Sequence, residues 1–347
     1  MTPHDFRRGG EAGTHTPRTL DTGLRADAPT GNSAQSDVPQ SVADGIRATT
    51  AHLIALDTRI GAEFLVPAAV RAATAARRTA RRDPESGRDT LAAAAEANQV
   101  AGWITYDAEH QTLSRHLSRE AFVLARTAGD RPLAHFALSQ LAMQNVHLRQ
   151  PVEAEHICDT ALQETRRGSV RTLFTLRKAR AAAQQGDHTR ARELIGRTYS
   201  SHQDGPRRGD PSWTWWLTEA EIAWHHAMIH ADADDWDGTI ERFSAATEHP
   251  AGYERAVFVA QTSLLWALAR AGAWTDAEAV LVNDVLPLQG TVGSVRSARL
   301  LAETRHILDR VHSRPTLRET ARQLAPHHEW PHSASQGGDR RRRPGAG

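Results

Sequence analysis

Residues 99–130 read QVAGWITYDAEHQTLSRHLSREAFVLARTAGD, and this stretch decides the fold. Apolar residues recur at intervals of three and four on both sides of Asp107, which is typical of two amphipathic helices. Gly102 is followed by a small residue twelve positions later, Ser114, and by another seven positions after that, Ala121. Small side chains at these positions let neighbouring helices approach closely, so the stretch predicts a tightly packed helical hairpin.

The same spacing returns along the chain in five sets. In order, the sets are Gly102, Ser114 and Ala121; Ala142, Ala154 and Ala161; Ala179, Ala191 and Thr198; His226, Gly238 and Ala245; and Leu265, Ala277 and Asp284. This spacing resembles that of the tetratricopeptide repeat, a helical hairpin of about 34 residues whose copies stack on one another. Strand-like alternation of β-branched residues is absent. We therefore predict an all-α fold, an α-solenoid of tetratricopeptide-like helical hairpins, with a single-core helical bundle as the alternative.

Composition divides the chain into three parts. Residues 1–43 are rich in Gly, Pro, Thr, Ser and Asp and lack apolar periodicity, which predicts a disordered tail. Residues 44–325 carry the helical pattern, interrupted by turns that contain Gly, Pro or Asp. Residues 326–347 form a second predicted tail, rich in Arg and Gly, that includes the run Arg340 to Arg343.

Charge and cysteine content exclude several classes of protein. Lysine and arginine total 42 and the acidic residues total 41, so the formal net charge of +1 gives no global attraction to nucleic acid or acidic membranes. Cys158 is the only cysteine, which excludes an intrachain disulfide and predicts a buried thiol in a reducing compartment. The chain lacks the apolar runs of a secretory signal or of a membrane span, which needs roughly 20 residues. We expect a cytoplasmic protein with no membrane partner.

Three blocks of sequence resemble a known family. The first is LDTRIGAEFLVPAAV at residues 56–70, and the second contains Ala101-Gly102-Trp103 with Tyr106 and Asp107. The third, ARTAGDRPLAHFALSQLAMQ, occupies residues 125–144. Together they resemble the tetratricopeptide-rich regulatory region of actinobacterial helix-turn-helix (XRE-type) transcriptional regulators. The resemblance covers about residues 45–325 and implies a sensing or interaction role.

The chain departs from that family ahead of the repeats. There such regulators carry a DNA-binding helix-turn-helix module, whereas the first 43 residues here are too few and too polar to form one. A second candidate, Thr316 to His332, has Pro326 and Pro331 where a recognition helix would lie. We therefore expect no direct sequence-specific DNA binding. A truncated remnant of a DNA-binding regulator is an alternative.

The repeat register predicts a contact surface for a partner. Gln99, Trp103 and Tyr106 share one side of a helix at spacings of four and three, and in a tetratricopeptide superhelix this side lines the concave groove. The predicted groove residues are Gln99, Trp103, Tyr106, Met143, His147 and Trp266. They indicate a non-enzymatic scaffold for a protein or peptide partner, such as a DNA-binding protein from another chain, and a homodimer is a further expectation. Packing between repeats is the alternative role of Trp103, and Asp107 is expected to brace the turn.

Catalysis and metal binding have less support in the sequence. No nucleophile–base–acid set, Gly-rich phosphate loop or cofactor fingerprint is present, so we predict no catalytic residue, cofactor or metal. The enzyme alternative, built on a helical toroid, would use Asp107, Glu219 or His226 as acid–base groups. His226 and His230 have the i, i+4 spacing of a metal-binding pair without an evident third ligand. The stretch SWTWW at 212–216 either stacks a ligand or fastens the loop before it.

Overall fold

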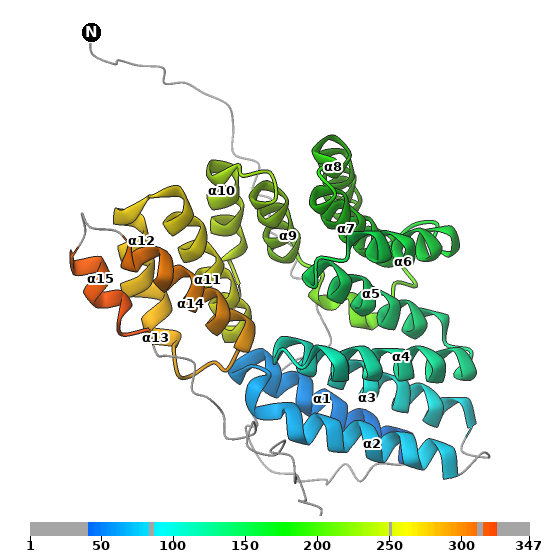
Figure 1. The fold of residues 1–347 in the computed structure, drawn as a ribbon. Helices are drawn as coiled ribbons and strands as arrows, with labels where there is room; N and C mark the ends of the chain where they lie inside the picture. The colour runs from blue at the N-terminus through cyan, green and yellow to red at the C-terminus, as the bar shows by residue number, and fades with distance from the viewer. Residues whose placement is uncertain (1–40, 83–86, 250–251, 311–314, 325–347) are drawn as a thin grey trace, which may run out of the picture. The chain divides into compact units, whose positions relative to one another are not determined.

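Helices make up most of the described chain (Figure 1). The computed structural model describes residues 41–82, 87–249, 252–310 and 315–324, which all belong to one unit, Pro39–Gly347. In chain order the α-helices are α1 (Val42–Ile60), α2 (Val66–Arg82), α3 (Gly87–Asp107), α4 (Gln111–Ala128), α5 (Arg131–His147), α6 (Pro151–Glu164), α7 (Ser169–Gln184), α8 (His188–Gln203), α9 (Glu219–Ala231), α10 (Trp236–Ala246), α11 (Glu254–Ala271), α12 (Trp274–Val280), α13 (Leu286–Leu288), α14 (Val295–Asp309) and α15 (Pro315–Ala321). Two 3₁₀ turns, η1 (Glu63–Leu65) and η3 (Ser212–Trp216), and a π-helical turn, η4 (Leu281–Val285), join them. An isolated bridge between Gln289 and Val292 is the only β-type pairing within these residues, so the all-α prediction is confirmed.

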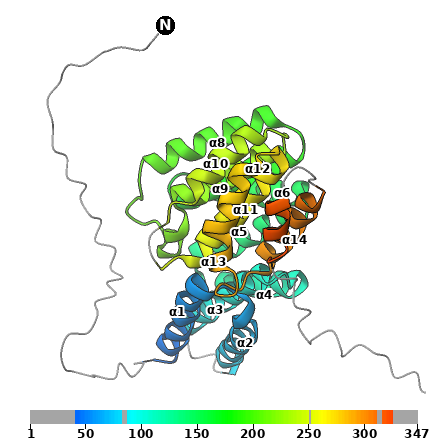
Figure 2. The same ribbon diagram turned by 90° about the vertical axis from the view of Figure 1, so that its left-hand side faces the viewer.

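The helices pack as a series of hairpins. The pairs are α3–α4, α5–α6, α7–α8, α9–α10 and α11–α12, with α1 and α2 packed against α3. The first helices of successive hairpins also contact each other, from α3 to α5, α5 to α7 and α7 to α9. Figures 1 and 2 show these pairs following one another along the chain. This order of contacts is that of an α-solenoid, as predicted.

Small residues mark the closest approach of helices in the first three of these hairpins. Ser114 Oγ donates a hydrogen bond to the Gly102 carbonyl oxygen at 2.8 Å, and a Cβ atom on Gly102 would lie 2.7 Å from Ser118 Oγ. The equivalent positions of the next two hairpins are fully buried: Ala142, Ala154, Ala179 and Ala191. The twelve-residue spacing in the sequence therefore corresponds to the contact between paired helices.

The α9–α10 hairpin is one residue out of the predicted register. The spacing predicts His226, Gly238 and Ala245 at the contact, but the residues with exposed fractions of 1% or less are Ala227, Thr239 and Ala246. Ala245 is exposed instead. An imidazole is too large for a close helix contact, and a shift of one residue places an alanine there.

The last hairpin departs from its predicted register at a π-helical turn. The spacing predicts Asp284 at a buried position, whereas the buried side chains are Leu281 and Val285. A π-helical turn holds one residue more than an α-helical turn, which moves the buried position from 284 to 285. Buried apolar residues therefore continue beyond α12, but at positions that the constant spacing does not predict.

The two ends of the solenoid contact each other through glycine. The Gly293 N–H donates to the Ile60 carbonyl oxygen at 2.8 Å, and the Glu63 N–H donates to the Gly293 carbonyl oxygen at 3.2 Å. Gly61 has a φ of +80°, and a Cβ atom there would lie 2.4 Å from the Gly293 carbonyl oxygen. Helix α1 also packs against α11. Backbone contacts thus join the segment after α1 to the segment before α14, and any side chain on Gly61 would prevent these contacts.

The first described helix begins at a side-chain cap. Helix α1 starts at Val42, just before the predicted residue 44, because Ser41 Oγ accepts a hydrogen bond from the Asp44 N–H at 3.1 Å and caps the helix. The predicted tails at 1–43 and 326–347 otherwise lie outside the described residues. None of the described helices combines the length and apolar character that crossing a membrane requires. Cys158 is fully buried, as predicted, and burial raises the pKa of its thiol to about 12.

We expect Gly61→Ala to destabilise the protein by about 3 kcal/mol, because the substitution combines a strained φ with a backbone collision. Gly129→Ala is the matched control, since Gly129 has a φ of +75° but no atom within 4 Å of an added Cβ. The control should lose only about 1 kcal/mol. Denaturant unfolding of both variants measures the difference. Equal losses would contradict a tight contact between the two ends.

Candidate functional site

Three of the predicted groove residues come together. Trp103 and Tyr106 lie in α3 with ring centroids 5.7 Å apart. His147, at the end of α5, meets the edge of the Tyr106 ring at a centroid distance of 5.2 Å. Tyr106 is 3% exposed, whereas Trp103 and His147 are only partly buried, so the three rings run from the interior toward solvent.

The other predicted groove residues lie elsewhere. Gln99 is fully buried, and neither its amide nitrogen nor its amide oxygen has a hydrogen-bond partner. Met143 is 7% exposed. Trp266 meets the edge of Trp236 at a centroid distance of 5.3 Å, and its Nε1–H donates to Glu303 at 2.9 Å. The predicted groove is therefore divided between buried positions, the Trp103–Tyr106–His147 group and a separate aromatic pair.

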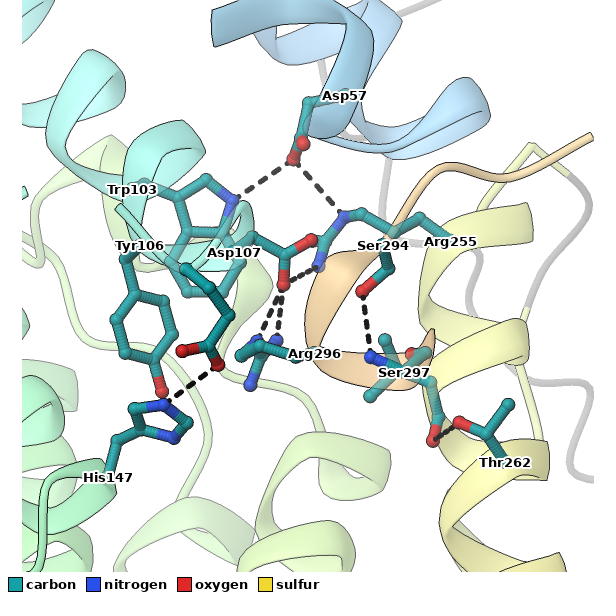
Figure 3. Close-up of polar contacts among 12 residues, drawn as sticks. Asp57, Trp103, Tyr106, Asp107, His147, Arg255, Thr262, Ser294, Arg296 and Ser297 are labelled. Carbon is teal, nitrogen blue, oxygen red and sulfur yellow. Dashed lines mark hydrogen bonds and ion pairs between the residues drawn. The ribbon is translucent and has the colours of Figure 1, made fainter. Parts of the chain in front are cut away.

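Two buried carboxylates lie beside the Trp103–Tyr106–His147 group, as Figure 3 shows. Asp57 of α1 is 4% exposed and Asp107 of α3 is fully buried. The Trp103 Nε1–H donates to Asp57 Oδ2 at 3.0 Å, and Arg255 Nε of α11 lies 3.2 Å from the same oxygen. Asp57 thereby connects three helices, α1, α3 and α11.

Asp107 forms a second long-range ion pair of the site. Arg296 of α14 donates from Nε to Asp107 Oδ1 at 2.8 Å across a sequence separation of 189 residues. Arg255 Nη1 lies 4.0 Å from the same carboxylate oxygen. The expectation that Asp107 braces its own turn is thus wrong, because the turn is closed by backbone hydrogen bonds such as His110 N–H to the Thr105 carbonyl at 2.9 Å.

The two arginines also pack on aromatic rings. The Arg255 guanidinium carbon lies 5.0 Å from the centre of the Trp103 ring. The Arg296 guanidinium carbon lies 4.9 Å from the centre of the Tyr106 ring and 5.9 Å from that of Trp103. Planar guanidinium groups combine ion pairing with stacking on aromatic faces, which ammonium groups do not. We call Asp57, Trp103, Tyr106, Asp107, Arg255 and Arg296 the interior cluster.

Burial and charge act against each other in the interior cluster. Burial raises the pKa of Asp57, and the positive charge of Arg255 offsets part of that rise. Burial lowers the pKa of Arg296, but Asp107, Tyr106 and Glu109 together outweigh burial and leave the pKa above its ordinary value. Arg296 therefore stays charged, as a buried carboxylate partner requires.

A polar rim connects the interior cluster to solvent. Glu109, which has a φ of +62°, accepts from Arg299 Nη1 at 2.8 Å and lies 2.9 Å from His147 Nε2. The side chains of His147 and Arg299 are 29% and 65% exposed. Burial raises the pKa of Glu109, but His147 and the neighbouring donors outweigh it, so the pKa lies below its ordinary value.

A second buried charge group occupies α7 and α9. Arg177 is 2% exposed and contacts His225 Nε2, which lies 3.1 Å from Glu221 Oε1. Burial and the charge of Arg177 lower the pKa of His225 to about 4. Burial opposes ionisation of Glu221, but its hydrogen bond and charge interaction with His225 and the charge of Arg177 lower its pKa to about 2. At neutral pH this group therefore contains a neutral imidazole between an arginine and a carboxylate.

The residues of the enzyme alternative do not form one constellation. Asp107 is held by Arg296, and Glu219 is exposed in the first turn of α9. His226 Nε2 lies 3.2 Å from His230 Nε2, and His230 Nδ1 lies 2.7 Å from Asp235. Across the described ranges no three His, Cys, Asp or Glu side chains are grouped as metal ligands would be.

The SWTWW stretch mainly fastens its loop. Trp213 stacks on Phe136 with ring centroids 4.5 Å apart, and Trp216 lies 5.8 Å from the Arg177 guanidinium carbon. Trp215 is the exposed member, at 45%. Of the two roles that the sequence leaves open, packing accounts for Trp213 and Trp216.

Arg255 and Arg296 are two of the site residues that sequence reasoning missed. Each lies at the start of a helix and belongs to no local motif. Two buried carboxylates imply that cations must lie nearby, but the sequence does not indicate which of its many arginines supply them.

Comparison of the chain with protein-family models finds no match, and a search of curated proteins finds no significant relative.

We expect Asp107→Asn to lower the free energy of unfolding by about 3–5 kcal/mol, because it leaves the Arg296 charge buried without its partner. Asp309→Asn is the control, since Asp309 lies 4.0 Å from Arg305 on an exposed surface. The control should change stability by less than about 1 kcal/mol. Chemical denaturation of both variants at pH 7 tests this, and similar losses would contradict a structural role for the buried pair.

Acidification from pH 7 to pH 5 should destabilise the protein through His225. Its folded-state pKa of about 4 lies below the ordinary 6.5, so the unfolded chain binds the proton first. The contribution of His225 to the free energy of unfolding is complete above about pH 6.5 and declines toward pH 4, with a loss of about 2 kcal/mol at pH 5. Glu221 keeps its contribution to stability between pH 7 and pH 5, because its lowered pKa changes the free energy of unfolding only below about pH 4.5.

Denaturation at pH 7 and pH 5 measures this effect. His225→Gln should reduce the difference between the two pH values, whereas His116→Gln, at an exposed position of α4, should behave as the wild type. An undiminished pH dependence in His225→Gln would assign the acid sensitivity to other groups.

Proposed function

We propose that this protein is a non-enzymatic regulatory scaffold of tetratricopeptide type that binds a protein or peptide partner. Its hairpins, with small buried residues at twelve-residue spacing, support this assignment because tetratricopeptide repeats are built in this way. Stacked helical hairpins create extended surfaces that bind other chains. The resemblance to the regulatory region of actinobacterial helix-turn-helix regulators points in the same direction.

The observation that carries the proposal is the meeting of aromatic and arginine side chains from both ends of the solenoid. Trp103 and Tyr106 of α3 pack against Arg296 of α14. His147 and Arg299 extend this group toward solvent, with side chains 29% and 65% exposed. Trp, Tyr and Arg are the residue types that most often dominate binding energy at protein interfaces. We define these five residues as the aromatic–arginine face and assign partner binding to it, with Trp103, His147 and Arg299 as the accessible contacts and the more buried Tyr106 and Arg296 as their support.

The chemistry of this face favours an acidic or carboxylate-bearing segment of the partner. Arg299 is largely exposed and, among the described residues, its one ion-pair partner is Glu109, so a carboxylate of the partner would compete for it at small cost. Gln99 and Met143 are too buried to make direct contacts and would support the face from behind. The partner that fits the regulatory resemblance is a DNA-binding protein from another chain in the cytoplasm, with a second copy of this chain as another candidate.

An acid–base enzyme is the less favoured alternative. The charge of Asp107 contributes to the raised pKa of Asp57, an effect that paired catalytic carboxylates also show. Each nevertheless forms an ion pair with an arginine. These carboxylates line neither the cavity between α6, α7 and α8 nor the cavity that Arg126, Gly129, Arg131 and Glu164 line. The scaffold is therefore the function that we retain.

Crosslinking and affinity purification from the native cell, followed by mass spectrometry, test the proposal. The wild type should retain a DNA-binding protein. The double variant His147→Ala, Arg299→Glu should reduce this recovery by about tenfold, which corresponds to about 1.4 kcal/mol of binding energy. The double variant leaves the interior ion pairs intact but removes both partners of Glu109, so denaturation beside the wild type checks that it is folded.

Arg119→Glu provides the matched control because Arg119 is exposed on α4, outside the aromatic–arginine face. It should retain the partner at the wild-type level. Equal recovery with Arg119→Glu and the double variant would remove the assigned face from the proposal. A wild-type protein that is monomeric and enriches no partner over an empty resin would overturn the scaffold function itself.

A further inference from the structure

We propose that a cavity between α6, α7 and α8 binds a small organic phosphate, at a site separate from the aromatic–arginine face. The cavity has a volume of about 350 Å³, within the range of about 300–1,000 Å³ that small-molecule sites occupy. Its lining residues are Leu162, Arg171, Thr175, Lys178, Leu194, Arg197 and Ser201. This proposal does not depend on the scaffold function.

The lining follows one face of each of two paired helices. Arg171, Thr175 and Lys178 are spaced by four and three residues along α7, and the residues from α8 are spaced by three and four. Leu162 near the end of α6 completes the lining. The site is thus held by regular secondary structure, which positions ligand-binding groups more precisely than loops do.

Positive charge dominates the lining. Arg171, Lys178 and Arg197 are cationic, and no lining residue is acidic. Glu155 and Asp159 of α6 pair with Lys178, but Glu155 also accepts from Arg190. Including Arg190, four cations therefore share Glu155, Asp159 and Glu193, which leaves one positive charge in excess.

Arg171 is the cation best placed to bind an anion. Its Nη1 donates to the carbonyl oxygens of Leu162 at 3.2 Å and Thr165 at 2.7 Å, and these bonds fix the guanidinium at the end of α6. No carboxylate in the described chain pairs with it. The Nε and Nη2 edge therefore keeps about three N–H donors for a ligand. This edge matches two oxygens of a phosphate group.

Arg197 provides a second cation from the opposite helix. Its partner is Glu193 at 3.8 Å, and both side chains are mostly exposed, at 71% and 61%. Such an exposed pair contributes little and exchanges readily with a stronger anion. A phosphate carries up to two negative charges, so it can interact with Arg171 and Arg197 at once.

The remaining lining residues favour an organic phosphate over the inorganic ion. Leu162 and Leu194 offer apolar surface for a short hydrocarbon or ring. Thr175 Oγ donates to the Arg171 carbonyl at 2.9 Å, which leaves its oxygen lone pairs for a ligand hydroxyl. Ser201 Oγ lies 2.6 Å from Thr172 Oγ and forms the polar margin on α8.

Isothermal titration of the full chain with phenyl phosphate tests the site. Benzoate and inorganic phosphate, measured at the same ionic strength, separate the contribution of the phosphate from that of the ring. We expect saturable binding of phenyl phosphate and weaker binding of both comparison probes. Arg171→Met and Arg197→Met should each weaken binding by about tenfold or more, since each removes a charge-assisted hydrogen bond.

Arg192→Met is the matched control because Arg192 is exposed on α8 but does not line the cavity. It should bind phenyl phosphate as the wild type does. Should Arg171→Met unfold through loss of its bonds to α6, Arg197→Met decides the outcome, since the ion pair of Arg197 with Glu193 is exposed and contributes little to stability. Absence of binding, equal affinity in the Arg192 and Arg197 variants, or benzoate binding as tightly as phenyl phosphate would each overturn the proposal.

Discussion

The carboxylate of Asp107 is fully buried and pairs with Arg296, which lies 189 residues away in the sequence, because a charge in the interior needs a partner of opposite sign. Most other helix contacts join neighbours in the sequence. This ion pair, together with the Asp57–Arg255 pair, brings α14 and α11 against the first helices. Removing one partner would leave a charge buried, so the contact between the two ends follows from an electrostatic requirement.

Close backbone packing joins the two ends at a second point. The Gly61 and Gly293 backbones approach so closely that a side chain on Gly61 would collide with a carbonyl oxygen. Two backbone hydrogen bonds on Gly293 then fix the segment that precedes Arg296. Charge pairing and glycine packing thus define one geometry for α14, and this geometry places Arg296 over Tyr106 and Arg299 beside Glu109. The proposed partner-binding face consequently consists of residues from both ends of the chain.

The sequence predicted the hairpins best where small residues meet directly. Gly102 and Ser114 form such a contact, and the equivalent alanines of the next two hairpins are buried. The prediction was one residue out at His226, because a bulky side chain rotated the helices to bury Ala227. It was also one residue out at Asp284, where a π-helical turn adds a residue. Of the predicted groove, Trp103, Tyr106 and His147 came together, whereas Gln99 and Met143 are buried and Trp266 lies apart.

The sequence by itself determined the all-α hairpin fold, because helical periodicity and small-residue spacing act between residues a few turns apart. Only the tertiary structure decided which cations neutralise Asp57 and Asp107. Arginines occur throughout the chain, and nothing in the local sequence of Arg255 or Arg296 distinguishes them from the rest. Which arginines reach the two carboxylates depends on the rotation from each hairpin to the next, added up along the solenoid. A register shift of one residue, or one π-helical turn, changes that total rotation.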